Sequence, residues 1–532
     1  MSTLDDWFLS ANERGNPDTH IDDGHPGGRA YTRGNRASVL IDGDDYFVCL
    51  HDALSRLDAG DAVWFTDWRG DADERLDGPD SEVGGVLARL AARGVDVRGL
   101  IWRSHSDLAH FSADENRDFV RVINRAAGEA LLDERVHRAG CHHQKIFVLH
   151  PRGGPMTAFI GGIDLSHGRG DDQRHLGDEQ IVQLDQRYGA RPAWHDAQLE
   201  VVGPAAFDVA TTFRERWTDP TPLDRRPRWR RAARSSTEPR DAQPLPPTPA
   251  GRPPSDGAHA IQVLRTYPAR RDPYPFARGG ERSIARAYLK AFSRAQSLIY
   301  IEDQYLWSPE AARAIAQALR RSPRLRIVAV VPCVPDRNGP LSGPPFRIGQ
   351  QRALAALRRA GGDRVAAYDL ENELECPIYV HAKVCVVDDV WMTVGSDNLN
   401  RRSWTNDSEA SCAIVDETLD DREPRDPGRL GDGARHLARE TRLRLWREHS
   451  GICADDERLL DPVTGFDALA QAAAALDGWH ASGRAGPRPP GRLRVHRPAP
   501  VRRLDGLWAG IAYDWLVDPD GRPRALRRAG RI

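Results

Sequence analysis

The sequence contains few lysines, no closely spaced cysteine pairs and no long apolar segment. The most apolar run, Ile327 to Val331, has the length of a β-strand, whereas a membrane helix needs about 20 apolar residues. The first residues, MSTLDDWFLS, are polar and acidic, without the basic start and apolar core of a secretory signal. We therefore expect no transmembrane segment and no signal peptide, and a cytoplasmic protein whose contact with membranes is at most peripheral.

The seven cysteines are scattered, odd in number and never arranged as Cys-x-x-Cys. This pattern indicates neither a structural zinc site nor a framework of disulfides. We expect a reduced protein that has no bound metal and no cofactor.

The charges of the chain nearly cancel, with 75 Lys and Arg against 77 Asp and Glu and a formal net charge of −2. This balance argues against a protein that coats nucleic acid, so no nucleic-acid partner is expected. The length of 532 residues, with 40% hydrophobic and 29% charged residues, suits two or three soluble globular domains.

Only three of the 75 basic residues are lysines: Lys145, Lys290 and Lys383. Lys145 and Lys383 occur in the same local pattern, His-x-Lys, which is described below. Lys290 lies in an amphipathic segment and is expected to be a solvated helix residue.

Short apolar strands alternate with helical segments in two stretches of the chain. In the first stretch, Ala62–Thr66 and Val95–Trp102 are predicted strands and Val83–Ala92 is a predicted helix. In the second stretch, Leu298–Glu302 and Leu325–Val331 are predicted strands, again separated by a helical segment. This alternation predicts an α/β fold in which each stretch forms a mixed, mostly parallel sheet flanked by helices.

The two stretches also agree in spacing, which indicates an internal duplication. Asp67 precedes His143 by 76 residues, and Glu302 precedes His381 by 79 residues. A period of this length is typical of duplicated half-domains rather than of a solenoid, and we expect the active site at their interface. The expected divisions are an irregular N-terminal segment (1–35), a first half (36–218), a Pro/Arg-rich linker (219–258), a second half (259–450) and a C-terminal extension (451–532).

The second half carries the pattern His381-Ala-Lys383, followed by Asp388 at a predicted hairpin turn and by Ser396 and Asn398. Residues i and i+2 of a strand share a face, so His381 and Lys383 are expected to point the same way. Asn398 follows the second strand of the hairpin and can return beside them.

The first half carries the matching pattern His143-Gln-Lys145, followed by His150 and, after a longer loop, by Asp164. The same argument places His143 and Lys145 on one face.

Two His-x-Lys pairs suit a reaction at a phosphate ester. One neutral imidazole can attack phosphorus to form a covalent intermediate, and the second, protonated, can donate to the leaving oxygen. Two lysines can hold the non-bridging oxygens, where negative charge must be stabilised in the transition state. An in-line displacement needs the two imidazoles on opposite sides of phosphorus, which two facing half-domains supply.

Each imidazole also needs a carboxylate on its other nitrogen, which fixes its tautomer and orientation. Two downstream candidates are Asp196, in Trp194-His-Asp196, and Glu409, in Asp407-Ser-Glu409.

These residues resemble the phospholipase D superfamily, which is defined by paired HxK(x)4D(x)6GSxN motifs. The second half matches every position of the motif: His381, Lys383, Asp388, Gly395, Ser396 and Asn398. The segments around His143, Gly161-Gly-Ile-Asp164, Trp194-His-Asp196 and Ile301-Glu-Asp-Gln304-Tyr305 are similar to the phosphatidylcholine-hydrolysing members. The resemblance covers roughly residues 40–450.

The resemblance implies hydrolysis of phosphatidylcholine-like lipids to phosphatidic acid and a head-group alcohol, through a covalent phosphohistidine and without a metal. It also implies transphosphatidylation when an alcohol replaces water. By the same analogy His143 is the nucleophile and His381 the acid, Asp196 and Glu409 orient them, and Asp388 braces the second hairpin. The protein is expected to act as a monomer on phospholipid at a membrane surface.

The first half departs from the motif at two positions, with His150 in place of Asp and Asp164 in place of Asn. Three other functions stay open, and the last of them is motivated by these two departures. The protein could be a nuclease or another phosphodiesterase of the superfamily, or a phosphatidyltransferase similar to cardiolipin synthase. It could also be a lipid-binding scaffold without catalysis.

Overall fold

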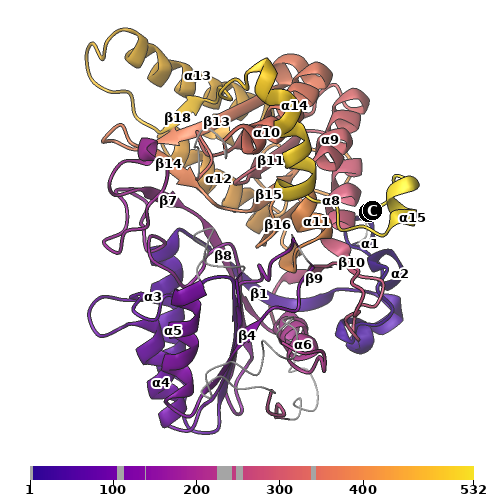
Figure 1. The fold of residues 1–532 in the computed structure, drawn as a ribbon. Helices are drawn as coiled ribbons and strands as arrows, with labels where there is room; N and C mark the ends of the chain where they lie inside the picture. Colours follow the sequence, from indigo (N-terminus) through magenta and orange to yellow (C-terminus); the bar gives the residue numbers. More distant parts are fainter. Residues whose placement is uncertain (1–3, 105–112, 138, 224–241, 247–255, 337–342) are drawn as a thin grey trace.

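The computed structural model describes residues 4–104, 113–137, 139–223, 242–246, 256–336 and 343–532. Two α/β halves lie one above the other, the first indigo to purple and the second magenta to orange (Figure 1). The fold class expected from the sequence is confirmed.

The sheet of the first half consists of seven strands in the order β4-β3-β2-β5-β6-β8-β1. Their bounds are β1 Thr32–Ile41, β2 Ala62–Asp67, β3 Asp96–Trp102, β4 Glu129–Asp133, β5 Ile146–His150, β6 Thr157–Gly161 and β8 Ala197–Val202.

The second half repeats this order as β13-β12-β11-β15-β16-β17-β9. Its strands are β9 His259–Tyr267, β11 Leu298–Glu302, β12 Arg326–Val330, β13 Val365–Glu371, β15 Val384–Val387, β16 Trp391–Gly395 and β17 Glu409–Asp416. Strand for strand, the two sheets therefore confirm the duplication inferred from the spacing.

Each sheet is mixed, and its parallel part is smaller than expected. Strands β2, β3 and β4 are parallel, as are β11, β12 and β13. The other strands named above pair antiparallel, because the His-x-Lys segments lead into hairpins that return beside the central strand.

The two sheets join through short additional pairings. Strand β1 pairs with both β8 and β9, and β7 (Ala193–His195), which leads directly into β8, pairs with β14 (Pro377–Val380) of the second half. Two shorter strands, β10 (Glu281–Arg282) and β18 (Leu493–Val495), extend the second half.

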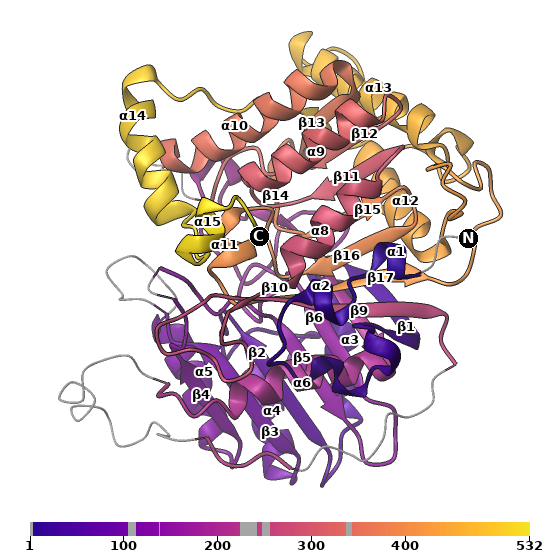
Figure 2. The same ribbon diagram turned by 90° about the vertical axis from the view of Figure 1, so that its right-hand side faces the viewer.

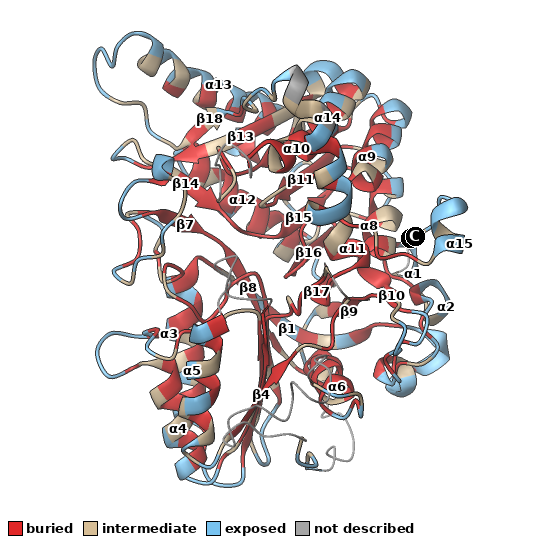
Figure 3. Ribbon diagram, viewed as in Figure 1, coloured by how far each residue is buried: buried red, intermediate tan, exposed pale blue. Residues whose placement is uncertain are grey.

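Helices cover the outer face of each sheet and also fill the space between the sheets. The outer helices are α3 (Gly43–Ser55), α4 (Val83–Ala92), α5 (Ala113–Asn124), α8 (Ser283–Arg294), α9 (Pro309–Arg321) and α10 (Gly343–Gly361). One shared core contains residues of both sheets together with α6 (Pro204–Trp217), α12 (His436–Ser450) and α13 (Pro462–Ala481). This shared core explains why buried residues run continuously from one half to the other (Figure 3).

The local sequence accounts for the helix starts. Helix α9 begins at Pro309, whose missing N–H is not needed in the first turn, and the Ser308 side chain accepts a hydrogen bond from the Ala311 N–H. Helix α13 begins in the same way at Pro462, with Asp461 as its cap.

The N-terminal segment is less irregular than expected. It forms the short helices α1 (Leu4–Trp7) and α2 (Ala11–Arg14), and β1 begins at Thr32. Lys290 of α8 holds this segment, because its Nζ donates to the carbonyls of Asp5 and Phe8 and lies 3.0 Å from Glu13 Oε2. The expectation of a solvated Lys290 was therefore wrong.

The linker expected at 219–258 lies largely outside the described residues, and its boundaries stay predictions. The C-terminal extension packs on the second half through α13, β18, α14 (Arg503–Ala512) and a π-helical turn (Tyr513–Val517), and it continues into the short helix α15 (Arg524–Arg528), which has no buried residue. Within the described residues, every helix is too short or too polar to cross a bilayer.

The hairpin brace takes a different form in each half. In the second half, buried Asp388 accepts hydrogen bonds from the backbone N–H groups of Gln296, Ser297 and Leu298, at 2.7–2.8 Å. In the first half, His150 occupies the equivalent position. Asp61, which directly precedes β2, the strand paired with β5, accepts a hydrogen bond from the Arg152 N–H at 2.7 Å. The direction of the brace is reversed, so the first hairpin is still held without an Asp at position 150.

Replacing either bracing carboxylate should destabilise the fold. Asp388→Ala should lower the free energy of unfolding by about 3 kcal/mol, because three buried N–H groups lose their acceptor. Asp61→Ala should lower it by about 2 kcal/mol, since Asp61 accepts from two backbone N–H groups. Urea denaturation at neutral pH measures both values.

Exposed Asp363 provides the matched control, and Asp363→Ala should change the free energy of unfolding by less than about 0.5 kcal/mol. Equal stability of Asp388→Ala and the wild type would contradict the bracing role.

Candidate functional site

His143 and His381 lie in extended segments just before strands β5 and β15, not inside the strands as expected. The residue after each lysine starts the strand, so the strand fixes the lysine while the histidine stays at the sheet edge. Both histidines border the same cavity, as the paired motifs require.

Each imidazole is held by a carboxylate from the other half of the molecule. His143 Nδ1 lies 2.9 Å from Oε2 of Glu409, which begins β17 in the second half. His381 Nδ1 lies 2.6 Å from Oδ2 of Asp196, which separates β7 from β8 in the first half. The site is therefore complete only when the two halves are docked.

Ser396 supports the first of these pairs. Its hydroxyl donates to Glu409 Oε2 at 2.6 Å and accepts from the Ala410 N–H at 3.0 Å. This places the Ser of the second-half motif behind the carboxylate that orients the first-half histidine.

The two lysines are buried beside their histidines. Lys145 Nζ donates to the His143 carbonyl at 3.2 Å and lies 3.1 Å from Asp164 Oδ1. Lys383 Nζ donates to the His381 carbonyl. A Cβ on Gly162 would lie 2.3 Å from Asp196 Oδ1 of the same half and 3.3 Å from Lys383 Cδ of the other half, so the packing of these two side chains against the backbone requires glycine.

Both imidazoles are held neutral. Burial lowers the pKa of His143 well below its ordinary value, and the nearby Lys145 and Lys383 lower it further. Burial and Lys383 lower the pKa of His381 to about 3, although Asp196 opposes this shift. A neutral imidazole keeps a lone pair for attack on phosphorus.

The two orienting carboxylates differ in charge. Burial opposes ionisation of Asp196, but His381 and Lys383 outweigh it and hold the pKa of Asp196 below its ordinary value. Burial and then Asp407 raise the pKa of Glu409 well above its ordinary value. Asp196 therefore favours a cationic His381 more strongly than Glu409 favours a cationic His143.

Asp164 and Asn398 occupy equivalent places, which explains the departure from the motif in the first half. The N–H of Leu165, after Asp164, donates to Asp67 Oδ2 at 3.1 Å, and the N–H of Leu399, after Asn398, donates to Asp303 Oδ2 at 2.7 Å. Burial and the neighbouring Asp164 raise the pKa of Asp67, whereas Lys145 and Arg169 overcome burial and lower that of Asp164. One protonated and one ionised carboxylate can thus lie side by side.

The cavity at the centre of this arrangement has a volume of about 590 Å³. Indole rings flank both histidines: Trp68 lies 6.1 Å from His143 and Trp194 lies 4.9 Å from His381, between ring centroids. Arg169 lies over Trp194, with its guanidinium carbon 3.9 Å from the ring centroid. The large apolar residues of the wall are Trp68, Trp102, Val182, Leu184, Trp194, Trp307, Phe346, Leu516 and Val517.

The structure thus brings together all four His and Lys residues, Asp164, Asn398 and both orienting carboxylates, whereas Asp388 lies in the hairpin turn. Sequence reasoning missed Asp67, Arg169 and Asp303. Asp67 and Asp303 end or follow strands of the parallel part of each sheet, where ligand-binding residues gather in α/β folds. Their position at the ends of predicted parallel strands could have identified Asp67 and Asp303 as site residues from the sequence.

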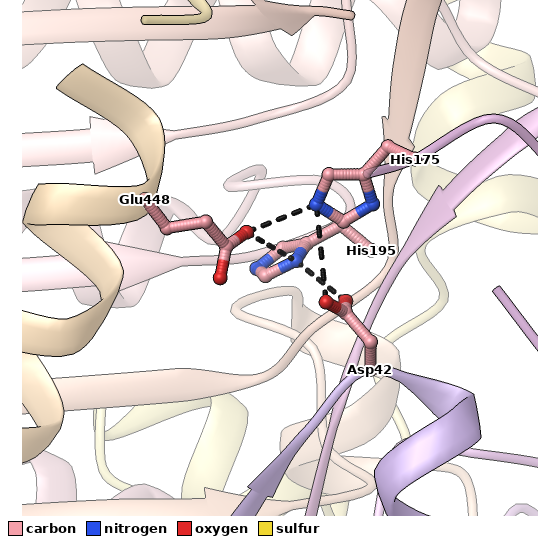
Figure 4. A group of neighbouring side chains, drawn as sticks. All are labelled: Asp42, His175, His195 and Glu448. Carbon is pink, nitrogen blue, oxygen red and sulfur yellow. Dashed lines mark hydrogen bonds and ion pairs between the residues drawn. The ribbon is translucent and has the colours of Figure 1, made fainter. Parts of the chain in front are cut away.

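A second polar cluster lies at the seam between the halves (Figure 4). It contains Asp42, His175, His195 and Glu448. His175 Nε2 is 2.9 Å from Glu448 Oε1 and 3.8 Å from Asp42 Oδ2, and His195 Nδ1 is 2.9 Å from Asp42 Oδ1 and 3.7 Å from Glu448 Oε1.

These donor atoms could hold a divalent cation. A tetrahedral ion with bonds of about 2.0–2.1 Å separates its ligand atoms by about 3.3–3.4 Å, within the range of the four separations. Asp42 Oδ2 is buried without a hydrogen-bond partner, and His175 Nδ1 faces the Trp194 carbonyl at 3.0 Å, which leaves Nε2 toward the cluster. Protonated His175 and His195 would satisfy the same contacts as ion pairs with Asp42 and Glu448. The four residues therefore fit either a bound divalent cation or two protonated imidazoles.

Glu302 joins this cluster to a third histidine. Its Oε2 lies 2.9 Å from His195 Nε2, and its Oε1 lies 2.6 Å from Nε2 of His449, which is beside Glu448 in α12. The cluster could not be predicted from the sequence, because its four residues come from four separate segments of the chain. The cluster adjoins the candidate site, since His195 directly precedes Asp196.

The family comparisons agree with the geometry. Residues 72–226 match the family described as Phospholipase D, and residues 288–422 match the one described as Cardiolipin synthase, PLD-like domain. Each match covers one His-x-Lys motif.

Curated relatives match most of the chain at low identity. Phospholipase D alpha 2 of Oryza sativa subsp. japonica is 25% identical over 545 residues, covering 76% of this chain and 64% of that protein. Phospholipase D A of Dictyostelium discoideum is 26% identical over 488 residues, covering 78% of this chain and 35% of that protein. The chain thus spans less than two thirds of the length of these relatives.

Among solved structures, the phosphatidylserine synthase of Haemophilus influenzae Rd KW20 shares the fold. It superposes with a TM-score of 0.50 at 15% sequence identity, over 72% of this chain and 82% of that one.

The charge of Lys383 should set the alkaline limit of activity. Burial lowers its pKa to about 8, so kcat/KM should fall as the pH rises through this value and the ammonium loses its proton. In Lys383→Arg the guanidinium stays charged, and the alkaline limb should disappear even though the rate is lower.

The third lysine supplies the control: Lys290→Arg should keep the wild-type pH profile. An alkaline limb that persists in Lys383→Arg would show that another group titrates.

Loss of the charge on Glu302 should weaken the seam between the halves. Glu302→Gln should lower the free energy of unfolding by about 3–5 kcal/mol, because His195 and His449 lose their shared buried carboxylate. Denaturant titration measures the loss, and Glu373→Gln, at an exposed position, should behave as the wild type. A loss below about 1 kcal/mol would argue against a charged network.

Proposed function

Because the chain belongs to the phospholipase D superfamily, we propose that it is a phospholipase D. It would hydrolyse the distal phosphodiester bond of phosphatidylcholine-like lipids, releasing phosphatidic acid and the head-group alcohol. Transfer of the phosphatidyl group to an alcohol would compete with hydrolysis.

The observation that carries this proposal is the exchange of carboxylates between the halves. The two imidazoles border one cavity, each oriented through Nδ1 by a carboxylate of the opposite half. This leaves Nε2 of both rings available for a substrate. Two buried lysines supply positive charge beside them.

In the first step, Nε2 of His143 attacks phosphorus and the bond from phosphorus to the head-group oxygen breaks. The leaving oxygen takes the Nε2 proton of His381, and the product is a phosphatidyl group on His143. The negative charge of the bound diester opposes the effect of Lys383 and favours the protonated form of His381. The ionised Asp196 stabilises the same form, which supports His381 as the acid.

In the second step, a water molecule gives a proton to His381 and attacks phosphorus. The bond between phosphorus and nitrogen breaks, phosphatidic acid leaves, and both histidines regain their starting forms. An alcohol in place of water gives the transfer product. Lys145 and Lys383 would hold the non-bridging oxygens in both steps.

The cavity wall supports a lipid substrate. Its apolar residues suit the glycerol and acyl part of a phospholipid, while the charged residues gather around the histidines. Both motifs come from one chain, so a monomer suffices for catalysis. The reaction would take place at the surface of a membrane. The proposed chemical steps use no resident metal.

The nucleophile can be identified by substitution. His143→Ala should reduce choline release from phosphatidylcholine by at least about 10³-fold while the protein stays folded, because no covalent intermediate can form. His150→Gln, half-buried in the first hairpin, should retain activity. Activity in a chelator should equal that of the untreated enzyme.

Mass spectrometry of His381→Ala, quenched after mixing with substrate, should find the phosphatidyl adduct on His143. Unchanged turnover in His143→Ala would reject the assignment, and cleavage of plasmid DNA faster than lipid would favour a nuclease.

A further inference from the structure

The C-terminal extension presents an apolar surface to solvent. Four large apolar side chains are exposed along α14 and the π-helical turn: Trp508 at 38%, Ile511 at 67%, Trp515 at 75% and Leu516 at 70%. This segment lies at the outer edge of the second half (Figure 2). We call these four residues the C-terminal apolar face.

The spacing of these residues places them on one side of the helical segment. Positions 508, 511, 515 and 516 correspond to i, i+3, i+7 and i+8, which share a helix face. The opposite side is already occupied, because Ala509 and Tyr513 pack with Trp307 and Ile348 in a small core. The Tyr513 hydroxyl also donates to Asp518 Oδ2 at 2.6 Å. The helix is therefore anchored by one side while its second apolar side has no cover among the described residues.

The C-terminal apolar face continues into the wall of the catalytic cavity. Leu516 and its neighbour Val517 line the same cavity as His143 and His381. A partner that covers Trp515 and Leu516 would thus lie at an edge of the cavity that receives the substrate. This continuity distinguishes the face from other exposed leucines, such as Leu374 and Leu419, which are absent from the cavity wall.

We propose that the C-terminal apolar face docks the protein on a phospholipid bilayer and places the cavity against the lipid head groups. The proposal rests on the proposed function, since it assumes that the substrate lies in that bilayer. Tryptophan is favoured at the boundary between acyl chains and head groups, because its ring is apolar and its N–H can bind polar groups. Ile511 and Leu516 would enter the acyl boundary beside the two indoles.

Basic residues follow the face in the chain. Arg524, Arg527, Arg528 and Arg531, in and after α15, are exposed, and no ion pair with a carboxylate is seen for them among the described residues. Such arginines would attract anionic lipid, so docking should be stronger on vesicles that contain phosphatidylglycerol and should weaken with salt.

The test compares two double variants in the His143→Ala background, in which lipid is not consumed. Ile511→Ser/Trp515→Ser removes two residues of the face that do not line the cavity, and Leu374→Ser/Leu419→Ser removes two exposed leucines elsewhere. Sedimentation with vesicles of phosphatidylcholine and phosphatidylglycerol measures the bound fraction. The first variant should bind at least about tenfold more weakly than the parent, and the second should bind equally well.

A parallel assay separates this proposal from the proposed function. With His143 restored, turnover of a monomeric short-chain phosphatidylcholine should be the same in both double variants and the wild type, whereas turnover of vesicles should fall only in Ile511→Ser/Trp515→Ser. If the wild type hydrolyses neither substrate, the proposed function fails, yet the sedimentation result still decides the docking proposal.

Vesicle binding of Ile511→Ser/Trp515→Ser within twofold of the parent would overturn the proposal. The proposal would also be overturned if the wild type were a dimer in analytical ultracentrifugation while Ile511→Ser/Trp515→Ser was a monomer that bound vesicles as well as the parent. The C-terminal apolar face would then join two copies of the chain.

Discussion

The structure depends on an exchange between its two halves, in which each contributes the carboxylate that orients the other's histidine. An imidazole whose Nδ1 faces a carboxylate presents Nε2 to the cavity in a fixed direction. Neither half could arrange its own histidine alone, so duplication of one half-domain produced a site that exists only at the interface. The shared core between the sheets, with α6, α12 and α13, holds this interface together.

The same interface buries many ionisable groups. Two lysines, several carboxylates and three further histidines lie at or near the seam, and isolated charges there would be costly. The cost is limited where these groups pair with one another: Lys145 has Asp164, His195 has Asp42 and Glu302, and His449 has Glu302. Burial also shifts the imidazoles of His143 and His381 toward the neutral form, which the proposed nucleophile needs.

The two halves have diverged without losing the geometry. Asp164 replaces the Asn of the motif, and a protonated Asp67 beside it makes an ionised Asp164 compatible with burial. His150 replaces the bracing Asp, and Asp61 supplies the brace from the neighbouring segment instead. In both cases a departure that looked like a defect in the motif is compensated by a residue distant in sequence.

The fold class, the duplication and the His-x-Lys pairs could be predicted from the sequence, because strand periodicity, helix amphipathicity and motif spacing are local properties of the chain. The sequence also identified Asp196 and Glu409 as orienting carboxylates, but it could not assign each to its histidine, since both pairings cross from one half to the other. The cluster around His195 and the position of the C-terminal apolar face beside the cavity were likewise decided by tertiary structure. Residues such as Asp42 and Glu448 are about 400 positions apart in the chain, and only the docking of the two halves brings their side chains to one point.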